Sequence, residues 1–436
     1  MRERRSLWAL MAFLFIGLSC GILWWTQQLH EIVIPPRQYP PNNAYDAYKQ
    51  IAQAMYDQWK QDERLRMIER ELFKGQEFNP AVPEADKRYC LQRRRPFLEA
   101  YRKHLDQPCV AVYEYDPLWL MPELAMFRQI ARIESILIDD ALEAGRDAEA
   151  IQHLRDLMRF SEQVRTDGTL THYLVGSSMI KIGLRPIRQR LMQIQSPETL
   201  DALVGLAQQY EQQRAPLKTA IQHEYYLGLA LHRDIASGKI KADDIQAMMS
   251  NITFNSGFER WLYESGFGLR LTWRRSLLEW QQHCKSVFAE LEKPLGERKI
   301  PATNLKQRIN QMFLHELDLA VDRELIEVAI VRLLGCYAAV KRYRQQRGAY
   351  PPSLEALRPE LGEMIIDPFT GKPFVYRTHP KRGFQLYSVG ENLNDDGGRL
   401  SANPRQGDLL PITEGALPEG QRPSQARLSS PPVWLR

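Results

Sequence analysis

The sequence predicts a mainly α-helical protein with an N-terminal transmembrane helix, an irregular helical ectodomain and a small C-terminal α+β module with a short antiparallel sheet. Three observations predict this fold class. An uncharged apolar run lies near the N-terminus, apolar residues recur at three- and four-residue steps through the centre, and turn and strand signals follow residue 348. With 436 residues, 44% hydrophobic and 25% charged content, the chain has the composition of a globular protein.

The apolar run covers residues 7–25 and contains no charged side chain. At about 1.5 Å per residue, a helix of this length is about long enough to cross a hydrocarbon core of roughly 30 Å. Three arginines precede the run within Met1–Arg5, and Trp8, Trp24 and Trp25 stand where the two interfaces would lie. We therefore expect a single-pass anchor in the inner (cytoplasmic) membrane, with the N-terminus in the cytoplasm and the bulk of the chain in the periplasm.

Two alternatives to an uncleaved anchor stay open. A cleaved signal peptide would end in a small-residue cleavage site, and the bulky residues at 24–25 make a poor one. A lipoprotein signal with lipidation at Cys20 is the second alternative, although Gly17 stands where such a motif has an aliphatic residue. Hydrophobic sequence also continues beyond this cysteine.

An oxidising compartment would permit disulfides among the four remaining cysteines. Cys90 and Cys109 flank one short helical segment, so we expect them to pair if any disulfide forms. Cys336 lies in an apolar stretch that favours a buried thiol. Cys284 follows His283, but adjacent residues on a helix point about 100° apart, which argues against a shared metal.

Five segments follow from composition and periodicity. They are 1–25 (cytoplasmic stub and anchor), 26–42 (Pro-rich spacer), 43–324 (helical ectodomain), 325–400 (α+β module) and 401–436 (a Pro-rich tail expected to be disordered). The net charge of +5 is spread along the chain without a basic block, so we expect no nucleic-acid partner.

Several helix boundaries in the ectodomain can be read from capping residues. Asn42 or Asn43 can cap a first helix that begins near Ala44. Gly145 can end one helix in a left-handed conformation before the next begins, and Ser196 can cap another that has Pro197 in its first turn. No second copy of any hairpin recurs at a fixed period, which favours an irregular helical domain over a repeat array with a peptide-binding groove.

Periodicity predicts further helices and one interruption between them. A second charged helix is expected over residues 84–104, and further helices within 170–192, 212–235 and 271–291. Residues 251–268 combine glycines and aromatic residues without a helical period, so we predict a loop or helix break there.

Residues 325–400 predict a helix to about residue 346, a turn at 367–373, strands at 374–377 and 383–390, and a polar loop at 391–398. This ordered series resembles the globular part of type II secretion major pseudopilins. The residues that carry the resemblance are Tyr350, Pro351, Asp367, Pro368, Gly371, Tyr376, Leu386, Ser388, Gly390, Asp395, Asp396, Gly397 and Gly398.

The resemblance stops at the N-terminus. Pseudopilins carry a cleavage motif directly before their apolar helix, and Met1–Arg5 lacks it. The whole chain looks like uncharacterised bacterial membrane-anchored proteins that join a helical ectodomain to such a module. A polymerising pilus subunit is therefore not expected, whereas protein partners in a secretion or pilus-like assembly are.

The resemblance also implies a calcium site in the Asp-rich loop. Its candidate ligands are Asn392, Asn394, Asp395 and Asp396, whose oxygens are of the hard type that Ca²⁺ prefers. An EF-hand fits poorly, because Asn403 stands where a bidentate Glu is required. A metal-free Asn/Asp/Gly turn is the alternative.

Common catalytic signatures are missing from the sequence, so no catalytic residue or organic cofactor is assigned. His223 and Glu224 are adjacent on a predicted helix and are expected to make ordinary hydrogen bonds. Two hypotheses follow. The first is a non-enzymatic, partner-binding or assembly protein anchored in the membrane, and the alternative is a membrane-anchored, hydrolase-like enzyme with a site between helices.

Overall fold

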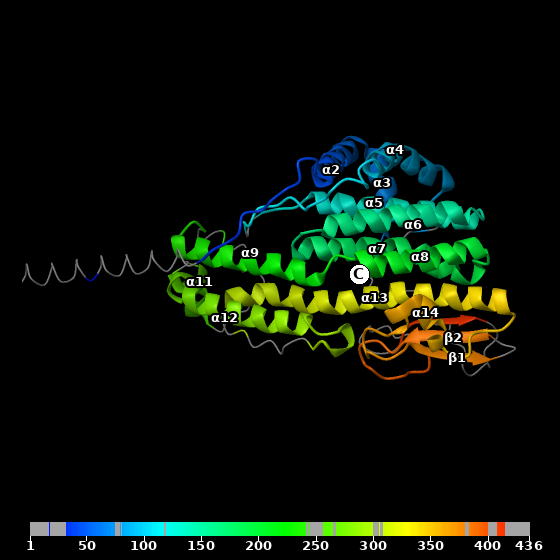
Figure 1. The fold of residues 1–436 in the computed structure, drawn as a ribbon. Coiled ribbons are helices and arrows are strands. Elements are labelled where there is room, and N and C mark those ends of the chain that lie inside the picture. The colour runs from blue at the N-terminus through cyan, green and yellow to red at the C-terminus, as the bar shows by residue number, and fades with distance from the viewer. Residues whose placement is uncertain are drawn as a thin grey trace, which may run out of the picture.

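The computed structural model is mainly helical and carries a small antiparallel sheet near its C-terminus, as the sequence predicts (Figure 1). It describes residues 17, 32–74, 79, 81–116, 119–240, 244, 256–264, 267–299, 305, 308–379, 383–399 and 408–414. Apart from Gly17, the predicted anchor lies outside the described residues. In these ranges no helix is both long enough and apolar enough to cross a bilayer.

The N-terminal helices form one side of the molecule. They are α2 (Ala44–Gln61), α3 (Glu63–Leu72), α4 (Glu84–Arg102) and α5 (Glu123–Glu143). Asn43 caps α2 as predicted, since its side chain accepts a hydrogen bond from the backbone N–H of Tyr45. The helix stops at Gln61 because Asp62 caps the next one, with its carboxylate accepting from the N–H of Leu65 at 2.9 Å.

The central helices continue the chain back and forth. They are α6 (Asp147–Arg165), α7 (Leu170–Arg190), η2 (Leu191–Gln193), α8 (Pro197–Gln213) and α9 (Leu217–Ser237). Two predicted boundaries are confirmed. Gly145 has a φ of +69° just after α5, and the Ser196 hydroxyl accepts from the N–H of Thr199 at the start of α8.

The last helices differ from the sequence-based expectation in two ways. They are α11 (Gly257–Glu264), α12 (Phe267–Leu291), η3 (Leu295–Glu297) and α13 (Arg308–Arg347). The sequence predicts a loop or helix break over residues 251–268; the loop is wrong for Gly257–Glu264, which form the helix α11, while the separate helices α11 and α12 agree with a helix break. The boundary expected between residues 324 and 325 falls inside α13, which is one continuous helix.

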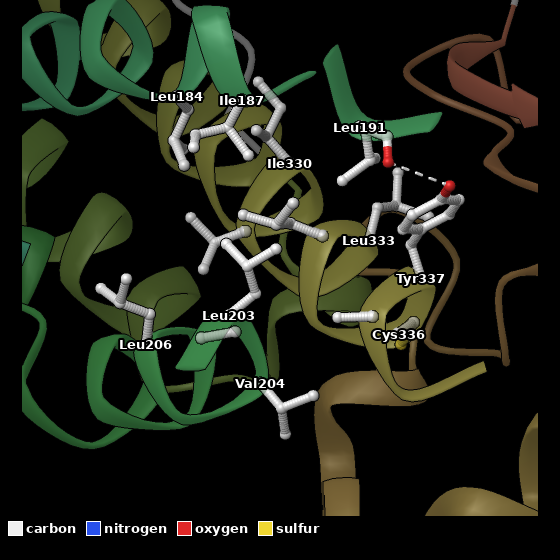
Figure 2. Packing of buried hydrophobic residues seen from close by; sticks show 14 of the residues in the cluster. Leu184, Ile187, Leu191, Leu203, Val204, Leu206, Ile330, Leu333, Cys336 and Tyr337 are labelled. Carbon is white, nitrogen blue, oxygen red and sulfur yellow. Dashed lines mark hydrogen bonds between the residues drawn. The ribbon is translucent and has the colours of Figure 1, made fainter. Parts of the chain in front are cut away.

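The largest core cluster explains why that boundary is not a division of the structure (Figure 2). Leu184 of α7, Leu203 of α8 and Leu333 of α13 are buried together in it. The Tyr337 hydroxyl donates to the carbonyl of Leu191 at 3.2 Å, which fixes α13 against the end of α7. The same cluster extends into the C-terminal module, so the module and the helical body share one core.

The C-terminal module packs on the last part of α13. It consists of η4 (Leu354–Leu357), α14 (Arg358–Leu361), η5 (Gly362–Ile365), β1 (Val375–His379), β2 (Gly383–Ser388) and β3 (Leu409–Glu414). The strand order is β1-β2-β3, with both pairs antiparallel. The Phe384 ring of β2 lies among the rings of Tyr337, Tyr350 and Tyr376, and thereby joins the sheet to α13.

Strand β3 corrects the prediction of a disordered tail for residues 409–414; apart from Asp408, the rest of 401–436 lies outside the described residues. Phe384 pairs with Glu414 and Ser388 with Leu409, so these six tail residues complete the sheet. The segment has no long apolar period, and its partner strand lies earlier in the chain, which is why composition alone missed it.

Candidate functional site

The extended segment before α2, residues 32–42, lies along the helical body and is held there by Arg37. The guanidinium donates to the Tyr113 hydroxyl at 2.7 Å and to the carbonyls of Ala111 and Asp167, each at 2.8 Å. It also lies 4.0 Å from the centre of the Tyr113 ring, a favourable cation–π geometry. Only 6% of the Arg37 side chain is exposed. Its positive charge is therefore enclosed by groups from the loops after α4 and α6.

His223 of α9 completes this group, which we call the Arg37 latch (Arg37, Tyr113, Tyr115, Asp167 and His223). Its Nε2 lies 2.6 Å from the Asp167 carboxylate, and its Nδ1 lies 2.7 Å from the Tyr115 hydroxyl and 3.2 Å from Arg37 Nη1. A guanidinium only donates, so Nδ1 is an acceptor and the network assigns the ring proton to Nε2, facing Asp167.

Asp167 adopts a backbone conformation that non-glycine residues rarely use. Its φ is +52°, in the turn between α6 and α7. Burial alone would raise the pKa of this carboxyl, but the hydrogen bond from His223 and the charge of Arg37 outweigh burial and lower it. The strained turn therefore presents a carboxylate to His223 while its carbonyl accepts from Arg37.

The latch has the connectivity of an activated hydroxyl, with a carboxylate, an imidazole and a hydroxyl in a chain. Its protonation disagrees with that chemistry, however. Burial raises the pKa of both Tyr113 and Tyr115 above the ordinary tyrosine value, so both phenols keep their protons near neutral pH. Arg37 also occupies the imidazole nitrogen that would accept the proton. The geometry fits a structural clamp on the extended segment better than a nucleophile.

A second histidine, His172, lies beside the latch, with its ring centre 5.3 Å from that of Tyr113. The N–H of Thr169 donates to His172 Nδ1, and Nε2 lies 2.8 Å from the Tyr45 hydroxyl, which in turn reaches Glu123. Burial, together with nearby positive charge, lowers the pKa of His172 to about 3. The ring is therefore neutral and supports the start of α7, where it takes part in a capping box.

A buried ion network joins α6, α8 and α13. Arg165 Nη1 donates to Glu327 Oε1 at 2.9 Å, and both side chains are fully buried. Arg165 also pairs with Glu162, and the Tyr210 hydroxyl donates to Glu327 at 2.7 Å. Gly176 of α7 leaves room for this arginine, since a Cβ there would lie 2.4 Å from its Cγ. These contacts stabilise the core and leave no surface for a substrate.

Lys181 lies near the same network on α7. Burial lowers its pKa to about 8, although the charge of Glu327 partly opposes the shift. Catalytic lysines have pKa values in this range, but so do lysines enclosed in a core. The charges that act on it include those of Glu327 and Arg165 in the core network, and no second observation indicates a reaction, so we assign it no catalytic role.

The four predicted calcium ligands lie in a loop whose polar groups are hydrogen-bonded to one another and to neighbouring residues. Asp395 Oδ1 accepts from the Tyr387 hydroxyl and from the N–H of Gly397, and its Oδ2 accepts from Arg377. Asn392 uses its amide N–H to donate to Asp396 at 2.8 Å.

Asp408, which the sequence analysis did not select, closes this loop instead. Its carboxylate accepts from the N–H groups of Asp396, Gly398 and Arg399. Asn394 contributes only its backbone N–H, which donates to the Asn392 side chain. Among the described residues no three His, Cys, Asp or Glu side chains are grouped for a metal. Calcium binding therefore stays a prediction.

The predicted disulfide between Cys90 and Cys109 is not formed. Both thiols are free and buried, with Cys90 facing Glu69 and Cys109 lying 3.4 Å from the carbonyl of Gln163. The two cysteines are near in sequence but do not contact each other. Cys90 lies on α4 and Cys109 in the loop after it, and each packs against different residues. Burial raises the pKa of each thiol to about 12, so neither is a reactive thiolate at neutral pH.

Three of the residues that carry the pseudopilin resemblance, Asp367, Tyr376 and Pro351, take part in hydrogen bonds that join separate segments of the module. Asp367 accepts from the N–H of Phe369 at 3.0 Å and from that of Val389 at 3.2 Å, so the Asp-Pro turn is joined to the Ser-x-Gly segment. The Tyr376 hydroxyl donates to the carbonyl of Pro351 at 3.1 Å, which joins the Tyr-Pro loop to β1. These hydrogen bonds hold the turn and the loop in place within the module.

The Arg37 latch escaped the sequence analysis because its members come from four distant segments. The Asp167-Gly168 dipeptide is a turn signal that could have pointed to the strained residue, whereas the sequence offers no reason to join His223 to it. No protein-family model, curated protein or solved structure matches this chain. The geometry of the described residues is therefore the basis for proposing a function.

Proposed function

We propose that this chain is a single-pass membrane-anchored, extracytoplasmic protein that binds a protein partner, without catalysis, in a type II secretion or pilus-like assembly. One observation carries the proposal. Three residues of the pseudopilin resemblance, Pro351, Asp367 and Tyr376, take part in hydrogen bonds that join the Tyr-Pro loop to β1 and the Asp-Pro turn to the Ser-x-Gly segment. Segments that match in sequence order are therefore also neighbours in the structure, which supports the proposal.

The body to which the module belongs is suited to a fixed position above the membrane. The module shares its core with α13, and the Arg37 latch fixes the extended segment that leads toward the predicted anchor. A partner bound at the module would therefore be held at a defined place relative to the bilayer.

The open side of β1 offers a surface for that partner. In the described sheet β1 is an edge strand, and Arg377 and Thr378 on it are exposed. Edge strands present backbone N–H and C=O groups that a partner strand can pair with. This surface lies on the same module as the residues of the resemblance.

The test is site-specific photo-crosslinking in native membranes. A photo-crosslinking amino acid replaces Thr378 at the sheet edge, and Gln152, an exposed residue of α6, serves as the control position. We expect adducts with secretion or pilus components at position 378 that are missing at position 152. Equal adducts at both positions, or none at 378, would contradict the proposal. Point substitutions are preferred to deletion of residues 325–400, because that deletion would cut α13.

A membrane-anchored hydrolase is the second candidate, and the chain Tyr115–His223–Asp167 is the observation that favours it. The raised pKa of Tyr115 and the occupied imidazole weigh against it. One variant, His223→Ala, distinguishes the two candidate functions. Replacing His223 with Ala would abolish turnover of ester or peptide substrates in an enzyme, whereas in a clamp it would loosen residues 32–42 and leave partner adducts at position 378 in place.

A further inference from the structure

Helix α11 presents two large aromatic side chains to solvent. Phe258 is 70% exposed and Trp261 is 58% exposed. They stand three residues apart, on one face of the helix, and their rings stack with centroids 5.9 Å apart. An exposed aromatic pair of this kind indicates a surface that contacts a membrane or another molecule.

This helix lies at the end of the molecule where the described chain begins (Figure 1). It packs on α12, whose first part joins the end of α9 in a small core cluster with Trp273 and Ile235. The side chains of Ile32 and Ile34 pack on this same cluster. The start of the extended segment and α11 therefore share one end of the body.

The length of chain before Ile32 limits how far this end can be from the bilayer. Residues 26–31 alone separate it from the apolar run that ends at Trp25. A fully extended chain covers at most about 3.6 Å per residue, so the connection spans no more than about 25 Å. If the apolar run crosses the membrane, this end of the body faces the membrane surface.

The chemistry of this end matches a lipid interface. Aromatic side chains favour the boundary between headgroups and acyl chains, and basic side chains favour anionic headgroups. Arg260 is exposed on α11 beside the aromatic pair, and Arg274 and Arg275 are exposed on the first part of α12. Val33, between the two inward-facing isoleucines, is 74% exposed and adds an apolar group at the same end.

We propose that α11 docks on the surface of the bilayer that holds the anchor, with Phe258 and Trp261 in the interface and Arg260 toward anionic headgroups. The inference rests on the proposed membrane anchor. It adds a second membrane contact, which fixes the orientation of the body as well as its distance from the bilayer.

The test compares two positions of equal exposure. A photo-crosslinking amino acid replaces Trp261 or, as the control, Met67 of α3, which is also 58% exposed and apolar. The full chain is reconstituted in vesicles of phosphatidylcholine with phosphatidylglycerol. We expect about tenfold more lipid adduct at position 261, since burying a large apolar side chain is worth at least that factor.

Charge gives a second readout. In the chain with the crosslinker at position 261, Arg260→Glu should lower the lipid adduct about fivefold in the anionic vesicles, because one basic residue near such a surface contributes about 1 kcal/mol, a factor of this size. It should have a much smaller effect in pure phosphatidylcholine. An unchanged adduct in anionic vesicles would overturn the role of Arg260.

Extraction of the vesicles with alkaline carbonate separates this inference from the proposed anchor. If the chain stays in the membrane while positions 261 and 67 give equal lipid adducts, the docking inference is wrong and the anchor stands. If carbonate releases the chain, the proposed anchor is wrong, and the docking inference fails with it. Adducts of position 261 with protein in native membranes, in place of lipid, would overturn the docking inference alone.

Discussion

Breaking the buried ion pair between Arg165 and Glu327 should destabilise the protein more than any exposed substitution. Replacing Glu327 with Leu leaves a fully buried guanidinium with only Glu162 as a charged partner and removes the acceptor of the Tyr210 hydroxyl. Removing one partner of a buried pair costs about 3–5 kcal/mol. Replacing Arg165 with Met leaves Glu327 without its main counter-ion, and we expect a cost of about 3 kcal/mol or more.

The double variant is the informative one. If the two costs were independent, they would add to about 6–10 kcal/mol, which is comparable with the whole stability of a typical domain. Replacing both partners with apolar residues leaves neither charge unpaired, so we expect a cost at least about 2 kcal/mol below that sum. Chemical denaturation of the full chain in detergent, followed by circular dichroism, measures the three differences.

An exposed pair supplies the control for this cycle. Arg358 pairs with Glu355 on the surface of the module, and Arg358→Met should leave the unfolding midpoint unchanged. Additive costs in the double variant, or single-variant costs below about 1 kcal/mol, would refute the view that this network holds α13 against α6 and α8.

The remaining predictions concern pH and packing. Burial lowers the pKa of His172 to about 3 and that of His232 to about 4, so between these values and about 6.5 the unfolded chain binds more protons than the folded one. Stability should therefore fall as pH drops from 7 to 5, by about 2 kcal/mol for each histidine, and a free energy of unfolding that is constant over this range would contradict the assignment. Gly228→Ala should destabilise by about 1–3 kcal/mol because its Cβ would lie 2.1 Å from Trp280 Nε1, whereas Gly205→Ala, with nothing within 4 Å, should stabilise α8 by about 0.5–1 kcal/mol. Melting curves of both variants test this pair, and a Gly228 variant as stable as the wild type would show that the indole can move.

Much of the fold could be predicted because its boundaries are encoded by single residues. Asn43, Gly145 and Ser196 each end or start a helix through a local hydrogen bond or a left-handed turn, and each acts where the sequence placed it. The turn at Asp367 was equally visible, since its side chain accepts from the backbone two residues later.

Features that depend on distant partners could not be predicted in this way. Strand β3 is held by pairing with β2 across the polar loop, and α13 extends further toward the N-terminus than its apolar stripe suggested. The Arg37 latch is the extreme case, since Arg37, Tyr113, Asp167 and His223 approach one another only after the helices have packed. Asp408 closed the acidic loop from beyond the segment that the resemblance covered.

The central claim is that residues 7–25 hold a folded body outside the cytoplasm, and one protease experiment tests it most directly. Spheroplasts of cells that produce the full chain with a tag before Met1 are treated with an impermeant protease, and the fragments are followed through the tag. The account predicts that the body is digested and that a short tagged fragment remains in the membrane. A full-length chain protected from protease until the cells are lysed would contradict the account.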